Sequence, residues 1–294
     1  MLAGLLILII LLVGCQLPPA QPAPISNITP TIVPNNISAV NNTNIINMTN
    51  TTIEPTIKPV ETKLAVYILH NSGRGSFVIT TENKSILVNS PGGSDGLRLL
   101  KIMKNLGINH LDYFILTNDE EGNIEGAPTM ILRFNSNHTI NSGIPSLKKE
   151  YKEYLSLSPN ISITPNDYSF AFGDSIINLI VPYDDGQSLT NDTTISLKIN
   201  YGDQKILITT DCRVDCESRI SNIDSDILIS NGNCDSLTYG FLKQVSPNLV
   251  IFSANPCPEV LSRVKNLDYE TLMVTDGDIL IAINGTNYEH RSFQ

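Results

Sequence analysis

Histidine and several common catalytic signatures are scarce or absent in this chain. Its 294 residues include four histidines, and their positions lack the spacing that metal ligands usually have. The glycines beside Arg74 lack the lysine and the length of a phosphate-binding loop. We therefore expect all four histidines to be surface or structural residues: His70, His110, His138 and His290.

Basic residues are missing from the first part of the chain, because neither Lys nor Arg occurs before Lys58. Residues 2–13 form an apolar run that is shorter than the roughly 20 residues a helix needs to span a bilayer. The run suits the core of an export signal, although the basic residues that normally precede such a core are absent. Because residues 12–15 are similar to a lipobox, we expect residues 1–15 to be a lipoprotein-type signal with Cys15 lipidated. An uncleaved hydrophobic anchor is the alternative, and both predict attachment to the extracellular face of the cell membrane.

Residues 16–62 have no aromatic side chain and three charged ones, Glu54, Lys58 and Glu61. Such a Pro-, Asn- and Thr-rich segment cannot bury enough apolar surface to fold, so we expect a disordered stalk. As a flexible chain it would hold the following domain roughly 35–40 Å from the membrane. Frequent Asn-x-Ser/Thr acceptor sites indicate a glycoprotein, most consistent with an archaeal cell surface. The predicted acceptors are Asn27, Asn36, Asn41, Asn47, Asn50, Asn83, Asn137, Asn160, Asn191 and Asn284.

Residues 63–294 are long enough for one large domain, and this domain is acidic. After Lys63 the chain has 27 acidic and 17 basic residues, which accounts for its net charge of −10. An acidic surface repels a phosphate backbone, and no basic patch is interleaved with aromatic residues. We therefore expect no nucleic-acid partner.

Short runs rich in Val, Ile, Leu and aromatic residues alternate with amphipathic segments along this domain. We predict helices over residues 96–106, 145–155, 236–245 and 258–265. In the first of these, Leu97, Leu100 and Met103 are spaced for one buried face, and Gly107 is the expected C-cap. The predicted strands cover residues 64–69, 75–80, 85–88, 113–116, 176–181, 194–199, 205–209, 226–229, 248–252, 271–274 and 278–283.

Residues 116–127, LTNDEEGNIEGA, resemble the metal-binding loop of the metallo-β-lactamase superfamily, Thr-His-x-His-x-Asp-His-x-x-Gly, in the form found in ComEC-type extracellular domains. In that loop the histidines and the aspartate hold metal ions that activate a water molecule. Their positions are taken here by Asn118, Glu120, Gly122 and Asn123. Asparagine is a poor zinc ligand and glycine has no side chain. The resemblance therefore implies that the scaffold is kept while the metal chemistry is lost.

The resemblance extends over nearly the whole domain. Asp211, at the end of residues 191–212, matches the metal-bridging aspartate and is the one such ligand retained. Gly232 and Asn233 stand where the family has a pair of histidines. Residues 70–77, 86–93, 106–118 and 274–289 also follow the family pattern. The implied fold class is α/β (α+β), a four-layer αβ/βα metallo-β-lactamase-like sandwich.

Four cysteines occur besides Cys15, an even number that suits an oxidising exterior. By the family layout, the loops that carry them meet at the former active-site mouth. Two disulfides would there pin loops that metal ions pin in active relatives, each contributing about 2–4 kcal/mol. We favour the pairs Cys212–Cys216 and Cys234–Cys257 over a crossed pairing, and the alternative to disulfides is a four-thiolate zinc site.

The sequence thus predicts a pseudoenzyme with no catalytic residue, resident metal or cofactor, which binds or scaffolds an unknown protein or small molecule. The alternative is a divergent metal-dependent hydrolase that holds zinc or another divalent cation with Asp211 and Asp119, Glu120 or Asp235. We expect residues 184–186 to form a turn. The remaining acidic cluster is expected to be a solvated loop rather than a weak Ca²⁺ site: Asp119, Glu120, Glu121 and Glu125.

Overall fold

The computed structural model describes residues 63–70, 74–143, 146–158, 161–163, 167–182 and 194–293. Several predictions lie outside these residues. They are the lipidation of Cys15, the stalk and its glycosylation sites, the turn at residues 184–186, and the acceptors Asn160 and Asn191. In the described part of the chain, no helix is long and apolar enough to cross a membrane.

The first of two sheets contains both ends of the described domain. Its strands run antiparallel from one edge to β3 and parallel beyond it. The order is β15 (Tyr288–Phe293), β14 (Asp278–Ile283), β1 (Leu64–Leu69), β2 (Ser76–Thr80), β3 (Ser85–Val88), β4 (Tyr113–Leu116), β5 (His138–Asn141) and β6 (Ile161–Ile163).

The second sheet is built by the later part of the chain, with parallel pairs from β10 to β13 and antiparallel pairs from β10 to β7. The order is β13 (Glu270–Met273), β12 (Leu249–Phe252), β11 (Ile227–Ser230), β10 (Gln204–Thr210), β9 (Ser196–Tyr201), β8 (Ser175–Ile180) and β7 (Tyr168–Phe172).

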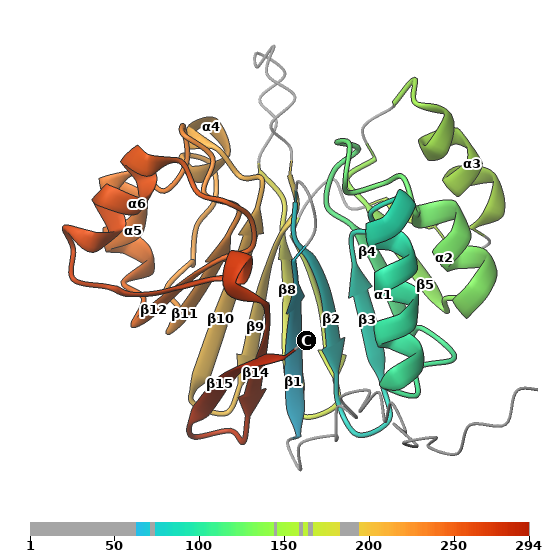
Figure 1. Ribbon diagram of the computed structural model, residues 1–294, viewed down its shortest axis with the longest axis horizontal. Coiled ribbons are helices and arrows are strands. Elements are labelled where there is room, and N and C mark those ends of the chain that lie inside the picture. Colours follow the sequence, from blue (N-terminus) through green and yellow to red (C-terminus); the bar gives the residue numbers. More distant parts are fainter. Residues whose placement is uncertain are drawn as a thin grey trace, which may run out of the picture. The chain divides into compact units, whose positions relative to one another are not determined.

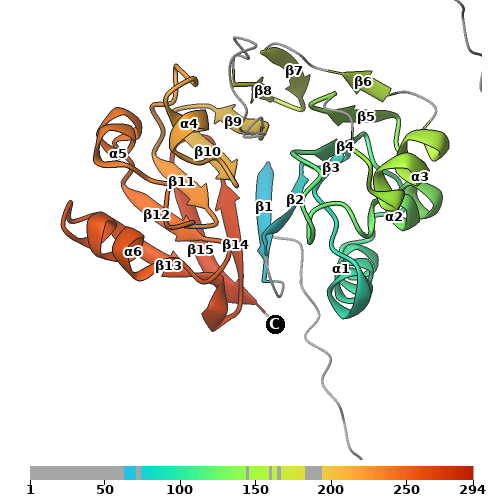
Figure 2. The ribbon, with the colours of Figure 1, turned by 90° about the horizontal axis from the view of Figure 1, so that it is seen from above.

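Helices cover the outer face of each sheet, which gives four layers (Figure 1). Seen from above, the two sheets face one another and the helices lie outside them (Figure 2). On the first sheet these are α1 (Gly93–Asn105), α2 (Ala127–Phe134) and α3 (Lys149–Leu157); on the second they are α4 (Val214–Glu217), α5 (Tyr239–Val245) and α6 (Pro258–Lys265). A short 3-10 turn, η1 (Val274–Asp276), precedes β14. The predicted four-layer sandwich is confirmed.

Strand β1 shows why the sequence selects this architecture. All six of its residues are buried. Leu64, Val66 and Ile68 pack between the two sheets, whereas Tyr67 and Leu69 pack beneath the helices on the other face. A strand that is covered on both faces reads as a continuous apolar run rather than an alternating one.

One prediction about helix α1 is wrong. Leu97 is 69% exposed instead of buried, and the buried face is formed by Leu99, Ile102 and Met103. The helix also begins at Gly93, so its first turn lies before the predicted start. Gly107 does follow the helix in the left-handed region at φ 73°, as expected for a residue that ends a helix.

Candidate functional site

Polar residues gather where strands of both sheets end. Asn118 lies two residues after β4, Asp211 directly follows β10, and Asn231 directly follows β11. Loops at the carboxyl ends of strands are the usual place for functional groups in sheets of this kind. The three side chains are at most 9% exposed and form one hydrogen-bonded cluster.

The Asp211 carboxylate is the centre of this cluster and is 1% exposed. Its Oδ2 accepts hydrogen bonds from Nδ2 of Asn123 at 2.8 Å and Nδ2 of Asn118 at 3.3 Å. Its Oδ1 accepts from Nδ2 of Asn231 at 2.6 Å and, at the 3.5 Å limit, from Nδ2 of Asn233. Four amides therefore surround the one carboxylate that matches a metal ligand of the family.

Arg74 supplies the positive charge of the cluster. Its guanidinium donates to Oδ1 of Asp211 through Nη1 and pairs with Glu120 through Nη2. The Arg74 side chain is 23% exposed, and that of Glu120 is 39% exposed. Arg74 thus links the buried carboxylate to the outer edge of the site. Arg74 was not predicted as a site residue, because it matches no ligand position of the family that the sequence resembles.

The arrangement does not fit a resident transition metal on Asp211. Zinc sites use thiolate, imidazole or carboxylate ligands, whereas the amide nitrogens here carry hydrogens that point at Asp211. The guanidinium has no lone pair to offer and is itself bound to the carboxylate. Oδ1 of Asn118 is also engaged, since it accepts from the backbone N–H of Glu120 at 3.1 Å and from Nδ2 of Asn123 at 2.6 Å.

Two glycines are required by the packing around this cluster. Gly232, at one of the lost histidine positions, has φ 72°, and a Cβ there would lie 2.7 Å from Cβ of Pro256. At Gly75, next to Arg74, a Cβ would lie 2.5 Å from Cβ of Ser253. Ser253 in turn donates to Oδ1 of Asn231 at 2.6 Å. At both positions the neighbouring side chains therefore leave no room for any residue larger than glycine.

Both disulfides form in the favoured pairing. Cα of Cys212 lies 5.3 Å from Cα of Cys216, and Cα of Cys234 lies 5.0 Å from Cα of Cys257, within the usual range for bridged cysteines. Crossed pairing and the four-thiolate zinc site are therefore wrong. Cys212 is adjacent to Asp211 and Cys234 is adjacent to Asn233, so both bridges hold loops of the polar cluster. Two disulfides also indicate an oxidising compartment.

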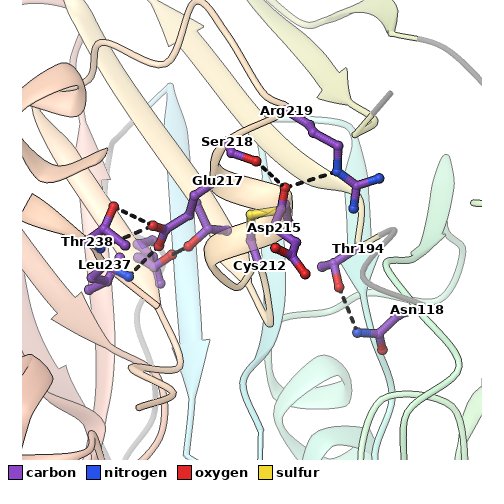
Figure 3. Close-up of a disulfide and its surroundings, with 12 residues drawn as sticks. Asn118, Thr194, Cys212, Asp215, Glu217, Ser218, Arg219, Leu237 and Thr238 are labelled. Carbon is purple, nitrogen blue, oxygen red and sulfur yellow. Dashed lines mark hydrogen bonds between the residues drawn. A yellow bond between two sulfur atoms is a disulfide. The ribbon is translucent and has the colours of Figure 1, made fainter. Parts of the chain in front are cut away.

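Helix α4 lies beside the first disulfide, and Glu217 ties it to the start of α5 (Figure 3). The Glu217 carboxylate is 5% exposed and accepts from the backbone N–H groups of Leu237 and Thr238 and from the Thr238 hydroxyl. Burial raises the pKa of Glu217, and these hydrogen bonds oppose the increase. The same view shows Asn118 donating to Oγ1 of Thr194 at 3.1 Å.

The other expected carboxylates are dispersed around the site. The backbone oxygen of Asp119 accepts from Nζ of Lys148, and Asp235 pairs with Arg213 at 3.8 Å. Glu125 accepts from the backbone N–H of Gly92 at 3.4 Å, and Glu121 is exposed. Within the described ranges, one group of three or more His, Cys, Asp or Glu side chains lies within metal-binding distance, and it consists of Cys234, Cys257 and Glu259. No described histidine belongs to that group.

Three predicted glycosylation sites fall on described residues, and all three asparagines are exposed. Asn83 lies in the turn between β2 and β3, and Asn137 lies just before β5. Asn284 lies in the hairpin between β14 and β15, where its Oδ1 accepts from the backbone N–H of Asn287 at 2.9 Å. The fold therefore leaves each of these side chains at the surface.

Solved structures with the metallo-β-lactamase fold are similar to this chain. One is the metallo-β-lactamase fold protein YhfI from Bacillus subtilis, with a TM-score of 0.51 at 12% identity over 71% of this chain and 96% of that one. Another is CmlA, a diiron β-hydroxylase from Streptomyces venezuelae, with a TM-score of 0.51 at 10% identity; 77% of this chain matches 55% of CmlA. No family model and no curated protein matches the sequence. At these identities the likeness establishes the fold: the domain is a metallo-β-lactamase-type sandwich.

Proposed function

We propose that this protein is an exported, membrane-anchored pseudoenzyme whose ComEC-like domain binds or scaffolds a partner at the outer cell surface. The observation that carries the proposal is the Arg74–Asp211 pair at the centre of the site. A metal hydrolase of this fold needs a cation that binds a water molecule and lowers its pKa. A guanidinium supplies charge but has no site at which a water oxygen could coordinate.

The surrounding amides support the same proposal. Asn118, Asn123 and Asn231 all direct N–H groups toward the Asp211 carboxylate. These bonds, together with the guanidinium, satisfy a charge that would otherwise be costly to bury. The former catalytic centre is therefore suited to holding its loops in a fixed arrangement. A fixed loop surface suits recognition of a protein or a small molecule.

The surface properties support an extracellular binding role. The domain is acidic, carries two disulfides, and exposes the acceptor asparagines Asn83, Asn137 and Asn284. A glycosylated acidic domain on a stalk is poorly suited to binding nucleic acid. We infer that its partner is a protein or small molecule outside the cell.

Metal analysis of the purified full chain, made in an oxidising host, tests the proposal. We expect less than stoichiometric zinc, iron or manganese. One tightly bound transition metal per chain would overturn the pseudoenzyme assignment. The matched variant is Asp211→Asn, which removes the carboxylate but keeps the side-chain shape, and we expect its metal content to equal that of the unmodified protein.

A metal-dependent hydrolase is the second candidate, because Asp211 and Glu120 bind the same guanidinium. If Arg74 moved aside, two carboxylates would face a common position where a divalent cation could replace it. This candidate predicts metal-stimulated phosphodiesterase or esterase turnover that Asp211→Ala abolishes. Turnover should persist in Asp174→Asn, which alters an exposed carboxylate in the turn between β7 and β8. Absence of turnover across both substrate classes would remove the hydrolase candidate.

A further inference from the structure

A second group of potential ligands lies apart from Asp211. Cys234, Cys257 and Glu259 place two sulfurs and a carboxylate oxygen within 4.8 Å of one another. In the described part of the chain, no other group of three such residues is this close. The group shares no residue with the Asp211 cluster. Its two cysteines are joined in a disulfide, so neither sulfur carries the thiolate charge that binds a metal in the oxidised protein.

The two disulfides differ in how far a reductant can reach them. Cys212 and Cys216 are 1% and 0% exposed. Cys234 is exposed and Cys257 is partly exposed. Thiol–disulfide exchange requires a thiolate to approach one sulfur along the bridge, so access controls its rate. Reduction should therefore open Cys234–Cys257 while Cys212–Cys216 stays closed.

We propose that reduction of the Cys234–Cys257 disulfide creates a binding site for zinc or a similar divalent cation. The protein ligands of this site are Cys234, Cys257 and Glu259. A dithiol reductant transfers two electrons and two protons to the bridge, which gives two cysteine thiols and leaves the reductant as a disulfide. A divalent cation then displaces both thiol protons into solvent and binds two thiolates and the Glu259 carboxylate. One water molecule completes a tetrahedral set of two sulfur and two oxygen ligands.

The backbone keeps the three ligands together when the bridge is open. The backbone N–H of Cys257 donates to the backbone oxygen of Gly232 at 2.8 Å, which joins the two loops independently of sulfur. Cys257 is the N-cap of α6 and Glu259 is in its first turn. The positive end of that helix favours nearby anionic groups. Ligand atoms about 2.0–2.3 Å from a tetrahedral metal lie less than about 4 Å apart, so small side-chain rotations suffice.

Cobalt binding to the full chain in detergent tests this proposal. A phosphine reductant, which does not compete for the metal, is added until mass spectrometry of alkylated protein counts two free thiols more than in the oxidised protein. Co²⁺ is then titrated, and absorption from thiolate-to-cobalt charge transfer is recorded, with Zn²⁺ as competitor. We expect one Co²⁺ per reduced chain and none in the oxidised protein. Glu259→Gln should weaken binding at least tenfold, because one of three protein ligands is lost.

The controls separate this site from the other cysteines. Alkylating the two thiols before adding Co²⁺ should abolish the absorption without any substitution that could impair folding. Cys234→Ser should do the same, whereas the Cys212→Ser/Cys216→Ser variant should bind Co²⁺ as before. Charge-transfer absorption in the oxidised protein, or in Cys234→Ser, would overturn the proposal. A requirement for four free thiols would overturn it as well, since the other disulfide would then contribute ligands.

Discussion

Arg74 is the residue on which the character of the site depends. A carboxylate as buried as Asp211 is costly to ionise unless charge and hydrogen bonds compensate it. Arg74 provides the charge, and the amides of Asn118, Asn123 and Asn231 provide the hydrogen bonds. Since Arg74 also pairs with Glu120, one side chain stabilises both the interior and the rim of the cluster.

Replacing Arg74 should therefore destabilise the domain. We predict that Arg74→Met lowers the free energy of unfolding by about 3 kcal/mol, because Asp211 loses the partner of a largely buried ion pair. Urea denaturation followed by circular dichroism would measure the change. The matched control is Arg133→Met, at an exposed position of α2, which should cost less than about 0.5 kcal/mol. Equal stability of the two variants would show that Asp211 does not need the guanidinium.

Asp224 gives a second prediction at this scale. Hydrogen bonds from Lys198 and Lys205 lower its pKa from 3.8 to about 2. A lowered pKa means that the contribution of Asp224 to stability is present above about 3.8 and is lost as the pH falls toward about 2. Asp224→Asn should therefore flatten the pH dependence of unfolding in that window. The effect should be small and salt-sensitive, because Asp224 is 58% exposed. Identical slopes for both proteins in acid urea titrations would contradict this prediction.

The residues of the site were only partly predictable. The family resemblance identified Asn118, Asn123, Asp211 and Asn233, and the structure brings all four together. It did not identify Arg74, because the family's motifs contain metal ligands and no arginine corresponds to one of them. The two members of that ion pair are 137 positions apart in sequence, and no local pattern connects them.

At the scale of elements, helix α4 is connected to helix α5 by Glu217. Its carboxylate accepts from two backbone N–H groups at the start of α5, at Leu237 and Thr238. Thr238 is also the N-cap of α5 and accepts from the backbone N–H of Phe241 at 3.2 Å. Backbone N–H groups at the beginning of α5, which have no acceptor within the helix, are thus hydrogen-bonded by a residue next to the Cys212–Cys216 bridge.

Two substitutions at Glu217 should behave differently. Glu217→Ala should lower the free energy of unfolding by about 1–3 kcal/mol, because buried N–H groups lose their acceptor. Burial raises the pKa of Glu217, so its stabilising contribution is complete below the ordinary glutamate pKa and declines as the pH rises through the raised value. Glu217→Gln cannot ionise, and its stability relative to the unmodified protein should therefore increase with pH. Denaturation curves across mildly acidic pH, with exposed Glu153→Gln as control, would refute this if the difference stayed constant.

Several strands with a strong apolar pattern were predicted well, whereas helix α2 was missed although five of its residues are buried. Strands β1, β3, β4 and β14 have the expected bounds, as does helix α6. Strand β5, with the sequence HTIN, is too short and polar to predict, yet its partners β4 and β6 hold it inside the sheet. The buried face of α1 was predicted wrongly because Leu97 and Leu99 are both apolar but lie on different sides of the helix. Leu99 is the one that packs in the core beneath the helix, and Leu97 is exposed.

At the scale of the whole molecule, the sandwich follows from apolar strands that are covered on both faces. The loops at one end are held by side-chain hydrogen bonds, by the ion pairs of Arg74 with Asp211 and Glu120, and by two disulfides. The disulfide loops span 4 and 23 residues in sequence. Cross-links of this kind restrict the unfolded chain and offset the loss of other loop contacts. The proposed binding role therefore rests on loops that are cross-linked at this end of the sandwich.

The proposed position of this platform outside the cell depends on the N-terminal anchor. If the thiol of Cys15 carries the lipid, Cys15→Ser should release the protein from the membrane fraction or block its maturation, because the remaining apolar run is too short to span a bilayer. Gln16→Ser is the matched control, since it changes the neighbouring residue and keeps the thiol. Fractionation by ultracentrifugation and mass spectrometry of the N-terminus would measure both effects. Membrane retention of Cys15→Ser, with an unmodified N-terminal mass in the parent protein, would instead establish the uncleaved hydrophobic anchor.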